Sequence, residues 1–192
     1  LIGQALARQM DIEKANAAFE SALAIEPDLP SAHYGLGNIA GQAGRYREAV
    51  TSYRRVIAVD PAHLDARLGE VTALALSGRE AEAIDRLERG RETLKEPPKL
   101  TYTLALLLLT AHTPSLRDPK RAVALAEQLV QRVPTPNHGE LLAVALAADG
   151  RYDEAARTQQ NLLDALPAGA SPELAERWRA RQREWQQKAS RQ

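Results

Sequence analysis

The sequence contains no cysteine, so disulfide bonds and thiolate metal ligands are excluded. This absence leaves the compartment open, because periplasmic proteins can also lack cysteine. Lysine plus arginine and aspartate plus glutamate each total 25, which makes the formal net charge zero. A chain without an excess of either charge has no overall attraction to nucleic acid or anionic lipid, and we expect no nucleic-acid partner.

Aromatic residues are scarce at 4%, and runs of β-branched residues are few, which disfavours β-sheet. Long apolar runs are missing as well. The longest, residues 104–109, is far too short to cross a bilayer, so we expect no direct insertion into a membrane. The sequence does contain 44% hydrophobic residues, mostly alanine and leucine, which is too many for a disordered chain and favours packed helices.

The sequence repeats itself. Alanines followed by a helical stretch recur at a nearly constant spacing, at Ala15, Ala49, Ala83, Ala122 and Ala155. At one fixed offset after these alanines stand Pro27, Pro61, Lys95, Pro134 and Pro167. Prolines at four of these five places, within a period of about 34 residues, indicate a solenoid of helical hairpins.

Each repeat carries signals for two helices and a turn. The first helix is predicted to end near Gly44, Gly78 or Gly150, because glycine tolerates the positive φ that closes a helix. The second helix is predicted to end at the proline. Helices of this length are unstable alone, so each must bury its apolar stripe against its neighbours.

Individual positions within the repeats make the pattern more specific. A small residue stands midway along the first helix, at Gly3, Gly37, Ala105 and Ala143. A larger apolar residue precedes it, at Ile2, Leu36, Leu104 and Leu142. The second helix opens with Tyr46 or Tyr152, or with Ile12 in the first repeat, and later carries Phe19, Tyr53 or Leu87. These residues resemble the tetratricopeptide-repeat (TPR) family, over residues 1–167.

The resemblance implies an all-α fold, a right-handed α-α superhelix (TPR solenoid) with a C-terminal capping helix. We expect about five TPR units, with a partial unit at 1–29, further units at 30–63, 64–97, 98–135 and 136–169, and a capping helix at 171–190. Within the first unit a short first helix should precede a second helix that opens at Ile12.

Three departures from the family pattern stand out. Repeat three has Glu70 and Val71 where an apolar and a small residue belong. The step from Ala83 to Ala122 is longer than the other steps, which predicts a longer loop before the second helix of repeat four. Repeat one lacks the start of its first helix, and the chain begins at Leu1 rather than methionine. We therefore expect a fragment or processed form of a longer protein.

The tail from Ser171 is predicted to form one more helix. Ser171 is suited to cap its N-terminus, and Leu174, Trp178 and Trp185 fall on one helical face. The first interpretation is that this face covers the apolar side of repeat five. The alternative is that the two tryptophans anchor a partner.

No group of residues predicts catalysis, a cofactor or a metal site. Residues 35–40 spell the G-x-G-x-x-A dinucleotide pattern, but no β-rich run lies nearby. The four histidines lack zinc-ligand spacing, and His33 is expected to pack where the family often has tryptophan. The arginines between 177 and 183 are spread around the helix, as on a solvated surface. We expect a protein that is not an enzyme.

The resemblance implies that the first helices line a concave, ligand-binding face. Carried onto this sequence, that face contains Tyr34, Asn38, Gln42, Leu68, Thr72, Lys99, Tyr102, Leu106, Glu140 and Val144. Asn38 matches one asparagine of the carboxylate clamp found in some members. Tyr34 and Gly69 replace the lysine and second asparagine of that clamp, so we do not expect it here. An alternative is that Leu106 and Leu109 are core, or are covered by the C-terminal helix.

The sequence therefore predicts a protein–protein interaction scaffold or adaptor that binds a peptide or helix of a partner. Two alternatives stay open: a structural array that self-associates into homo-oligomers, and the regulatory arm of a larger enzyme. The preference for arginine over lysine and the abundance of alanine are typical of bacterial proteins. The sequence does not decide between the bacterial cytoplasm and the periplasm.

Overall fold

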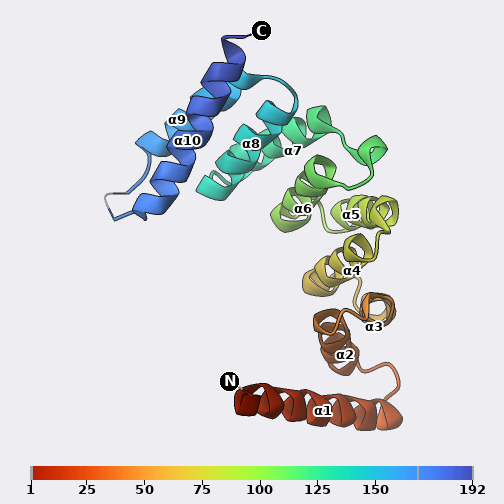
Figure 1. Cartoon of the computed structure of the whole chain (residues 1–192). Helices are drawn as coiled ribbons and strands as arrows, with labels where there is room; N and C mark the ends of the chain where they lie inside the picture. Colours follow the sequence, from red (N-terminus) through yellow and green to blue (C-terminus); the bar gives the residue numbers. More distant parts are fainter. Residues whose placement is uncertain (1, 168, 192) are drawn as a thin grey trace. The chain divides into compact units, whose positions relative to one another are not determined.

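The computed structural model describes residues 2–167 and 169–191, with side chains described from residue 11 onward. Over these residues the secondary structure consists of ten α-helices and one short 3-10 turn, with no strand (Figure 1). The expected all-α class is confirmed. The chain divides into two compact units, Leu1–Lys95 (unit 1) and Glu96–Gln192 (unit 2).

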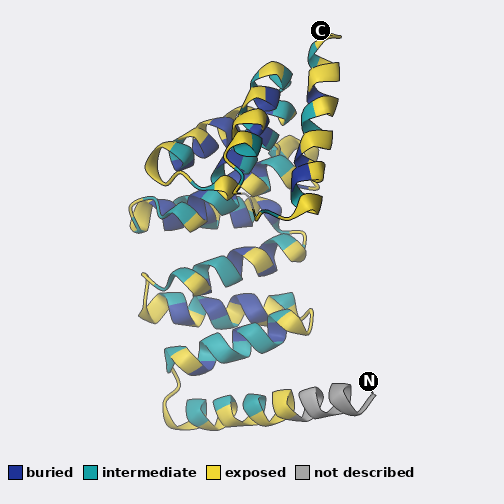
Figure 2. Cartoon of the chain, turned by 90° about the vertical axis from the view of Figure 1, so that its left-hand side faces the viewer, coloured by how far each residue is buried: buried dark blue, intermediate teal, exposed yellow. Residues whose placement is uncertain are grey.

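Unit 1 contains five helices. They are α1 (Ile2–Ile25), α2 (Pro30–Gln42), α3 (Tyr46–Val59), α4 (Leu64–Leu76) and α5 (Glu80–Thr93). Each helix packs against the next, and α2 also contacts α4, so the first helices of repeats two and three lie side by side. Buried and exposed residues alternate along α2, α3, α4 and α5, as short amphipathic helices require (Figure 2).

Unit 2 follows the same plan. Its elements are α6 (Pro98–Thr110), the 3-10 turn η1 (Pro114–Leu116), α7 (Pro119–Arg132), α8 (Pro136–Ala148), α9 (Tyr152–Asp164) and α10 (Pro172–Ala189). The longer loop predicted in repeat four is confirmed between α6 and α7. It is tied down by the Arg117 side chain, which donates to the Ala111 carbonyl at 2.7 Å, and by Asp118, which caps α7.

The turn glycines have the predicted conformation. Gly44, Gly78 and Gly150 have φ values of +73°, +78° and +81°. After Gly44, the Arg45 amide donates to the Ala40 carbonyl at 2.9 Å, which is the long bond of a Schellman C-cap. A side chain at these positions would strain the backbone, so these glycines determine where the first helices α2 (Pro30–Gln42), α4 (Leu64–Leu76) and α8 (Pro136–Ala148) stop.

The first repeat differs from the prediction. Residues Ile2–Ile25 form one continuous helix, so the expected helix break before Ile12 is wrong. The repeat alignment places Met10 where the later repeats have Gly44 and Gly78, and methionine lacks glycine's freedom to adopt positive φ. Nothing in the local sequence therefore ends the helix. The packing predicted at Ile2 and Gly3 lies outside the described side chains.

Four of the five repeat alanines lie in the core. Ala49, Ala83, Ala122 and Ala155 are each fully buried. A small side chain at this point lets two helices pack without displacing the larger residues around it.

An ion-pair network explains the unusual Glu70. Its side chain is buried, with a relative exposure of 2%, and its Oε1 accepts from Arg54 Nε at 2.7 Å. Arg86 Nε lies 3.3 Å from the same oxygen, and Arg54 also bonds Glu82. A buried carboxylate is tolerated when charged donors surround it, so Glu70 links α4 to the second helices on both sides.

The C-terminal helix α10 packs against α9, and its tryptophans are buried. Trp178 and Trp185 have relative exposures of only 3% and 6%. The Ser171 hydroxyl accepts from the Leu174 amide, as predicted for an N-cap. Because both indoles are buried within the chain, the alternative that they anchor a partner is wrong.

Candidate functional site

The residues predicted to form a ligand-binding face lie on α2, α4, α6 and α8. None of them is buried, although each of these helices also carries fully buried residues on another face. Five of them belong to unit 1, namely Tyr34, Asn38, Gln42, Leu68 and Thr72. Five belong to unit 2, namely Lys99, Tyr102, Leu106, Glu140 and Val144. Each set therefore forms an accessible row on its own unit.

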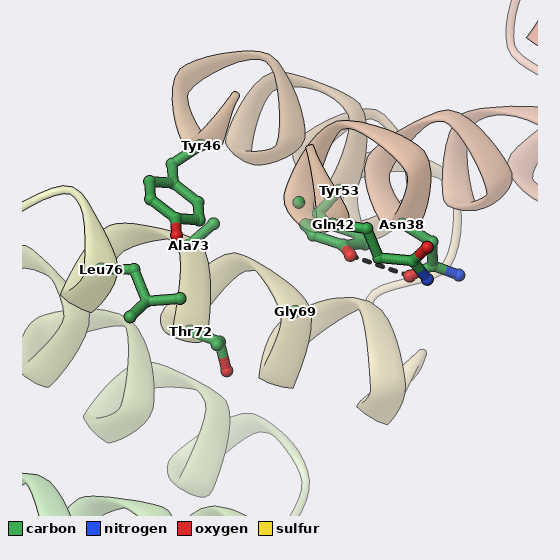
Figure 3. A pocket seen from close by; sticks show the side chains of 9 residues that line it. Asn38, Gln42, Tyr46, Tyr53, Gly69, Thr72, Ala73 and Leu76 are labelled. Atoms are coloured by element: carbon green, nitrogen blue, oxygen red, sulfur yellow. Dashed lines mark hydrogen bonds between the residues drawn. The ribbon is translucent and has the colours of Figure 1, made fainter. Parts of the chain in front are cut away.

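Unit 1 has a pocket between α2, α3 and α4, with a volume of about 290 Å³ (Figure 3). Its lining consists of Asn38, Gly41, Gln42, Tyr46, Tyr53, Gly69, Thr72, Ala73 and Leu76. Three of the predicted residues line it: Asn38, Gln42 and Thr72. Tyr46, Tyr53 and Leu76 were not predicted as site residues, because the repeat pattern assigns second-helix aromatics to packing.

A hydrogen bond joins two of the residues that line this pocket. The Tyr53 hydroxyl on α3 donates to Asn38 Oδ1 on α2 at 2.8 Å. The repeat pattern asks only for a large residue at position 53, and its counterparts Phe19 and Leu87 have no hydroxyl. The polar atom was thus visible in the sequence, but its partner was not.

Two glycines hold the Tyr53 ring between neighbouring helices. A Cβ at Gly37 would lie 2.7 Å from Tyr53 Cε1, and one at Gly69 would lie 2.5 Å from Tyr53 Cζ. Both distances are too short for a real side chain. Gly69, which departs from the clamp pattern, is therefore explained by the space that the Tyr53 ring needs.

Further aromatic contacts surround Tyr53. The Tyr34 ring lies 6.0 Å from the Tyr53 ring and 5.0 Å from the His63 ring. Burial, with a smaller effect of the nearby Tyr34 hydroxyl, raises the pKa of Tyr53 above its ordinary value. The Tyr53 hydroxyl therefore keeps its proton and remains a hydrogen-bond donor at neutral pH.

The pocket lining carries no acidic or basic side chain. It offers amide and hydroxyl groups from Asn38, Gln42 and Thr72, together with the apolar surfaces of Tyr46 and Leu76. No lysine or arginine stands among these lining residues to bind a carboxylate.

In unit 2 the predicted residues have other neighbours. The Tyr102 ring lies 6.0 Å from the His138 ring. Glu140 Oε1 accepts from Arg181 Nη1 of α10 at 2.8 Å, so this carboxylate is already engaged by the C-terminal helix. Leu106 has a relative exposure of 41%, so the alternative that it belongs to the core is wrong.

Three histidines, His33, His63 and His138, form hydrogen bonds with the backbone near the start of a helix. His33 Nε2 lies 2.9 Å from the Pro27 carbonyl, and His138 Nδ1 lies 2.6 Å from the Val133 carbonyl. His63 Nδ1 accepts from the Ala66 amide and so caps α4. Among the residues with described side chains, no three histidine or carboxylate groups are arranged to hold a metal ion. Within the described helices, none is both long and apolar enough to span a bilayer.

Comparisons with known proteins agree on one architecture. The family model described as "Tetratricopeptide repeat" matches residues 1–44, 34–93 and 115–170. A solved structure of the MamA protein of Desulfovibrio magneticus is similar, with a TM-score of 0.68 and 18% identity over 88% of this chain and 94% of that one. A thermophilic TPR protein of Thermus thermophilus gives a TM-score of 0.63 and 21% identity, covering 94% and 95% of the two chains.

A third similar structure is YrrB, described as a TPR protein with an unusual peptide-binding site. Its TM-score is 0.66 at 17% identity, over 92% of this chain and 88% of that one. At such identities the likeness concerns the fold alone.

Proposed function

The chain belongs to the tetratricopeptide-repeat family, and from this premise we propose that it is a scaffold that binds an extended segment of a partner protein. The TPR fold is typical of protein–protein interaction scaffolds. Each unit by itself offers an accessible row for such a segment, on α2 and α4 in unit 1 and on α6 and α8 in unit 2. No catalytic role, cofactor or nucleic-acid partner is assigned.

The observation that carries this proposal is the pocket of unit 1. It lies where the accessible row of α2 meets that of α4, and it combines amide groups with apolar surface. Small sites of this composition bind short stretches of peptide through a few hydrogen bonds and one or two apolar anchors. The described peptide-binding site of YrrB supports the proposal at the level of fold, while the pocket of this chain supports it independently.

Unit 2 contributes a second, more apolar contact surface. Tyr102 and Leu106 lie one helical turn apart on α6, and both are accessible. Val144 on α8 is also partly exposed, and α6 contacts α8, which places these residues on neighbouring helices. Exposed aromatic and aliphatic groups of this kind are common anchor points in protein interfaces.

Affinity capture from a lysate of the source organism tests the proposal. The baits are the parent chain, a unit 1 variant (Gln42→Ala with Thr72→Ala) and a unit 2 variant (Tyr102→Ala with Leu106→Ser). A matched control carries Arg47→Ala and Thr51→Ala, which remove two exposed side chains from the second helix α3.

We expect a protein held by the parent and by the control, and lost or strongly reduced with one or both site variants. Equal recovery from all four baits would place binding elsewhere on the chain. Recovery of the bait alone, together with an apparent mass that rises with concentration in size-exclusion chromatography, would favour the self-associating array instead.

A further inference from the structure

The segment that joins the two units has an unusual backbone. Residues 94–97 (the connecting segment) lie between α5 and α6, and unit 1 ends within them at Lys95 (Figure 1). Lys95 and Glu96 have φ values of +55° and +57°. Among the residues that the structure describes, they are the only ones other than glycine with a positive φ. A Cβ makes this left-handed conformation unfavourable, so two such residues in succession strain the backbone.

This conformation explains the exception in the repeat pattern. Lys95 stands where the other four repeats have proline, and proline fixes φ at about −65°. A proline could therefore not adopt the conformation seen at Lys95. In the connections at residues 26–29, 60–63 and 133–135, all of which the structure describes, no residue has a positive φ. The same repeat architecture thus has an unstrained way to join its hairpins, which the connecting segment does not use.

Contacts within unit 2 hold the strained conformation. The Glu96 carboxylate accepts a hydrogen bond from Gln128 Nε2 and lies 3.6 Å from Arg132 Nη1. The same Arg132 nitrogen donates to the Glu96 carbonyl at 3.0 Å. Two side chains of α7 therefore hold both the side chain and the backbone of Glu96. We call these three residues the clasp.

The clasp is weak enough to open. The side chains of Arg132 and Glu96 have relative exposures of 48% and 47%, and ion pairs in such contact with water contribute little to stability. The strain acts against the clasp, because opening it lets the left-handed residues return to a favoured φ. A strained segment that is held by a few weak contacts is suited to change between two conformations.

We propose that the connecting segment is a two-state switch between the units. In its closed state Lys95 and Glu96 are left-handed and the clasp is formed. In its open state the clasp is broken and the segment takes the backbone conformation of the other connections. A change of φ at two successive residues reorients the chain that follows, so release of Glu96 from α7 changes how the two units are joined.

Limited proteolysis of the full chain tests the switch, because trypsin can cleave the connecting segment after Lys95. The clasp variant carries Gln128→Ala and Arg132→Met, which leave the sequence around the cleaved bond unchanged. We expect cleavage after Lys95 to become about tenfold faster than in the parent, because the segment opens more often.

Two controls separate opening of the segment from a general loss of stability. Cleavage after Arg157 on α9 reports on the rest of unit 2, and its rate should stay that of the parent. A matched control variant carries Lys120→Met and Gln131→Ala, which change two exposed side chains of α7 outside the clasp. Its cleavage after Lys95 should also stay that of the parent.

A distance between the units provides an independent measurement. Because the chain has no cysteine, spin labels can be attached at Thr51→Cys on α3 and Ala124→Cys on α7, both exposed positions. Lys95→Pro excludes a positive φ, so we expect it to shift the distance measured by double electron–electron resonance to that of the open state. A label pair within unit 1, Thr51→Cys with Ala81→Cys, should give the same distance with and without Lys95→Pro.

The two experiments decide the proposal. Faster cleavage at Lys95 alone, together with a shifted distance in Lys95→Pro, supports the switch. Unchanged cleavage in the clasp variant, or an equal rise at Arg157, would overturn it, because the clasp would then have no effect or only a structural one. A distance between the units that Lys95→Pro leaves unaltered also overturns it, since the left-handed residues would then not determine how the units are joined.

Discussion

One buried position of the repeat carries a polar side chain in both units, but only in unit 1 does that side chain have a hydrogen-bond partner. In unit 1 it is Tyr53, whose hydroxyl reaches Asn38 on the preceding helix. In unit 2 it is Gln159, which is fully buried and has no hydrogen-bond partner at either amide atom. The residue at the place of Asn38 in repeat five is Val144, whose side chain has no polar atom to bond.

This difference teaches that a polar group at this buried position must be satisfied from the facing helix. Repeat three fills the position with Leu87 and repeat four with Ala126, and neither side chain needs a hydrogen-bond partner. A buried amide without partners costs about 1–3 kcal/mol of folding free energy. The Gln159 position therefore marks a weak point on α9, whereas Tyr53 strengthens its own repeat and shapes a pocket.

The largest predicted effect comes from crowding the Tyr53 ring. Gly69→Ala places a Cβ 2.5 Å from Tyr53 Cζ, and Gly37 on the other side prevents the ring from moving away. We expect a loss of about 1–3 kcal/mol in the free energy of unfolding, measured by urea titration with circular dichroism. The matched control is Gly41→Ala, whose Cβ would meet its nearest neighbour at 3.9 Å.

The control variant should become more stable, by about 0.5–1 kcal/mol, because alanine is the better helix former. Stabilisation by both variants would contradict the confinement of Tyr53.

Replacing the unpaired amide of Gln159 by an apolar side chain should stabilise repeat five. Gln159→Leu replaces a buried polar side chain by the residue found at position 87, so we expect a gain of about 1–2 kcal/mol. Thermal unfolding of parent and variant measures it. A loss of stability would mean that the Gln159 amide has a partner in solution, such as a buried water molecule.

Removing the hydrogen bond from Tyr53 to Asn38 should change the free energy of unfolding in the opposite direction and by a smaller amount. Tyr53→Phe removes the hydroxyl and leaves Asn38 partly exposed to water, so we expect a loss of about 0.5–1.5 kcal/mol. The same urea titration measures it. If Tyr53→Phe raised stability as Gln159→Leu does, the contrast between the two repeats would disappear.

The smallest predicted effect concerns the loss of stability at acidic pH. The bond from Arg54, aided by Arg79, lowers the pKa of Glu82 below its ordinary value of 4.5. A lowered pKa in the folded state adds stability at neutral pH, which is lost as the pH falls from that value through the folded pKa.

Unit 2 offers the matched case for this effect. Glu154 occupies the equivalent position, and a bond from Arg151 lowers its pKa as well. The residue at the place of Arg54 in the repeat before it is Glu127, an acid, so no second arginine from that position can reach Glu154.

We expect Glu82→Gln, which removes the titrating carboxylate and leaves Arg54 bonded to Glu70, to flatten the acid dependence of stability, measured as the thermal midpoint between about pH 3 and pH 7. The NMR titration of Glu154 should stay unchanged in that variant. A shift of the Glu154 titration would show that the two sites are coupled.

Much of the fold could be predicted because its signals are local or periodic. The turn glycines, the prolines and the buried alanines each act within a few residues or recur with the repeat. The exception is α1, where the repeat pattern predicted a break that Met10 does not support. The repeat pattern predicted the break although Met10 replaces the turn glycine. The local sequence, which contains no residue that ends a helix there, was the better guide.

The candidate site could be predicted only in part. The pattern placed Asn38, Gln42 and Thr72 on an accessible face, and they line the pocket. It missed Tyr53, because its bond to Asn38 depends on how α2 and α3 pack. It also did not foresee that Glu140 would be engaged by Arg181, which lies far along the chain on α10.

The sequence by itself determined the repeat, the ends of most helices and the faces that they bury, because these follow from residue spacing and backbone preference. Only the tertiary structure decided which buried polar groups are satisfied. Tyr53, Glu70 and Gln159 all occupy apolar positions of the repeat, yet the first two find donors or acceptors on neighbouring helices and the third does not. Hydrogen bonds need their atoms within about 3 Å, a precision that helix packing sets and a repeat pattern does not carry.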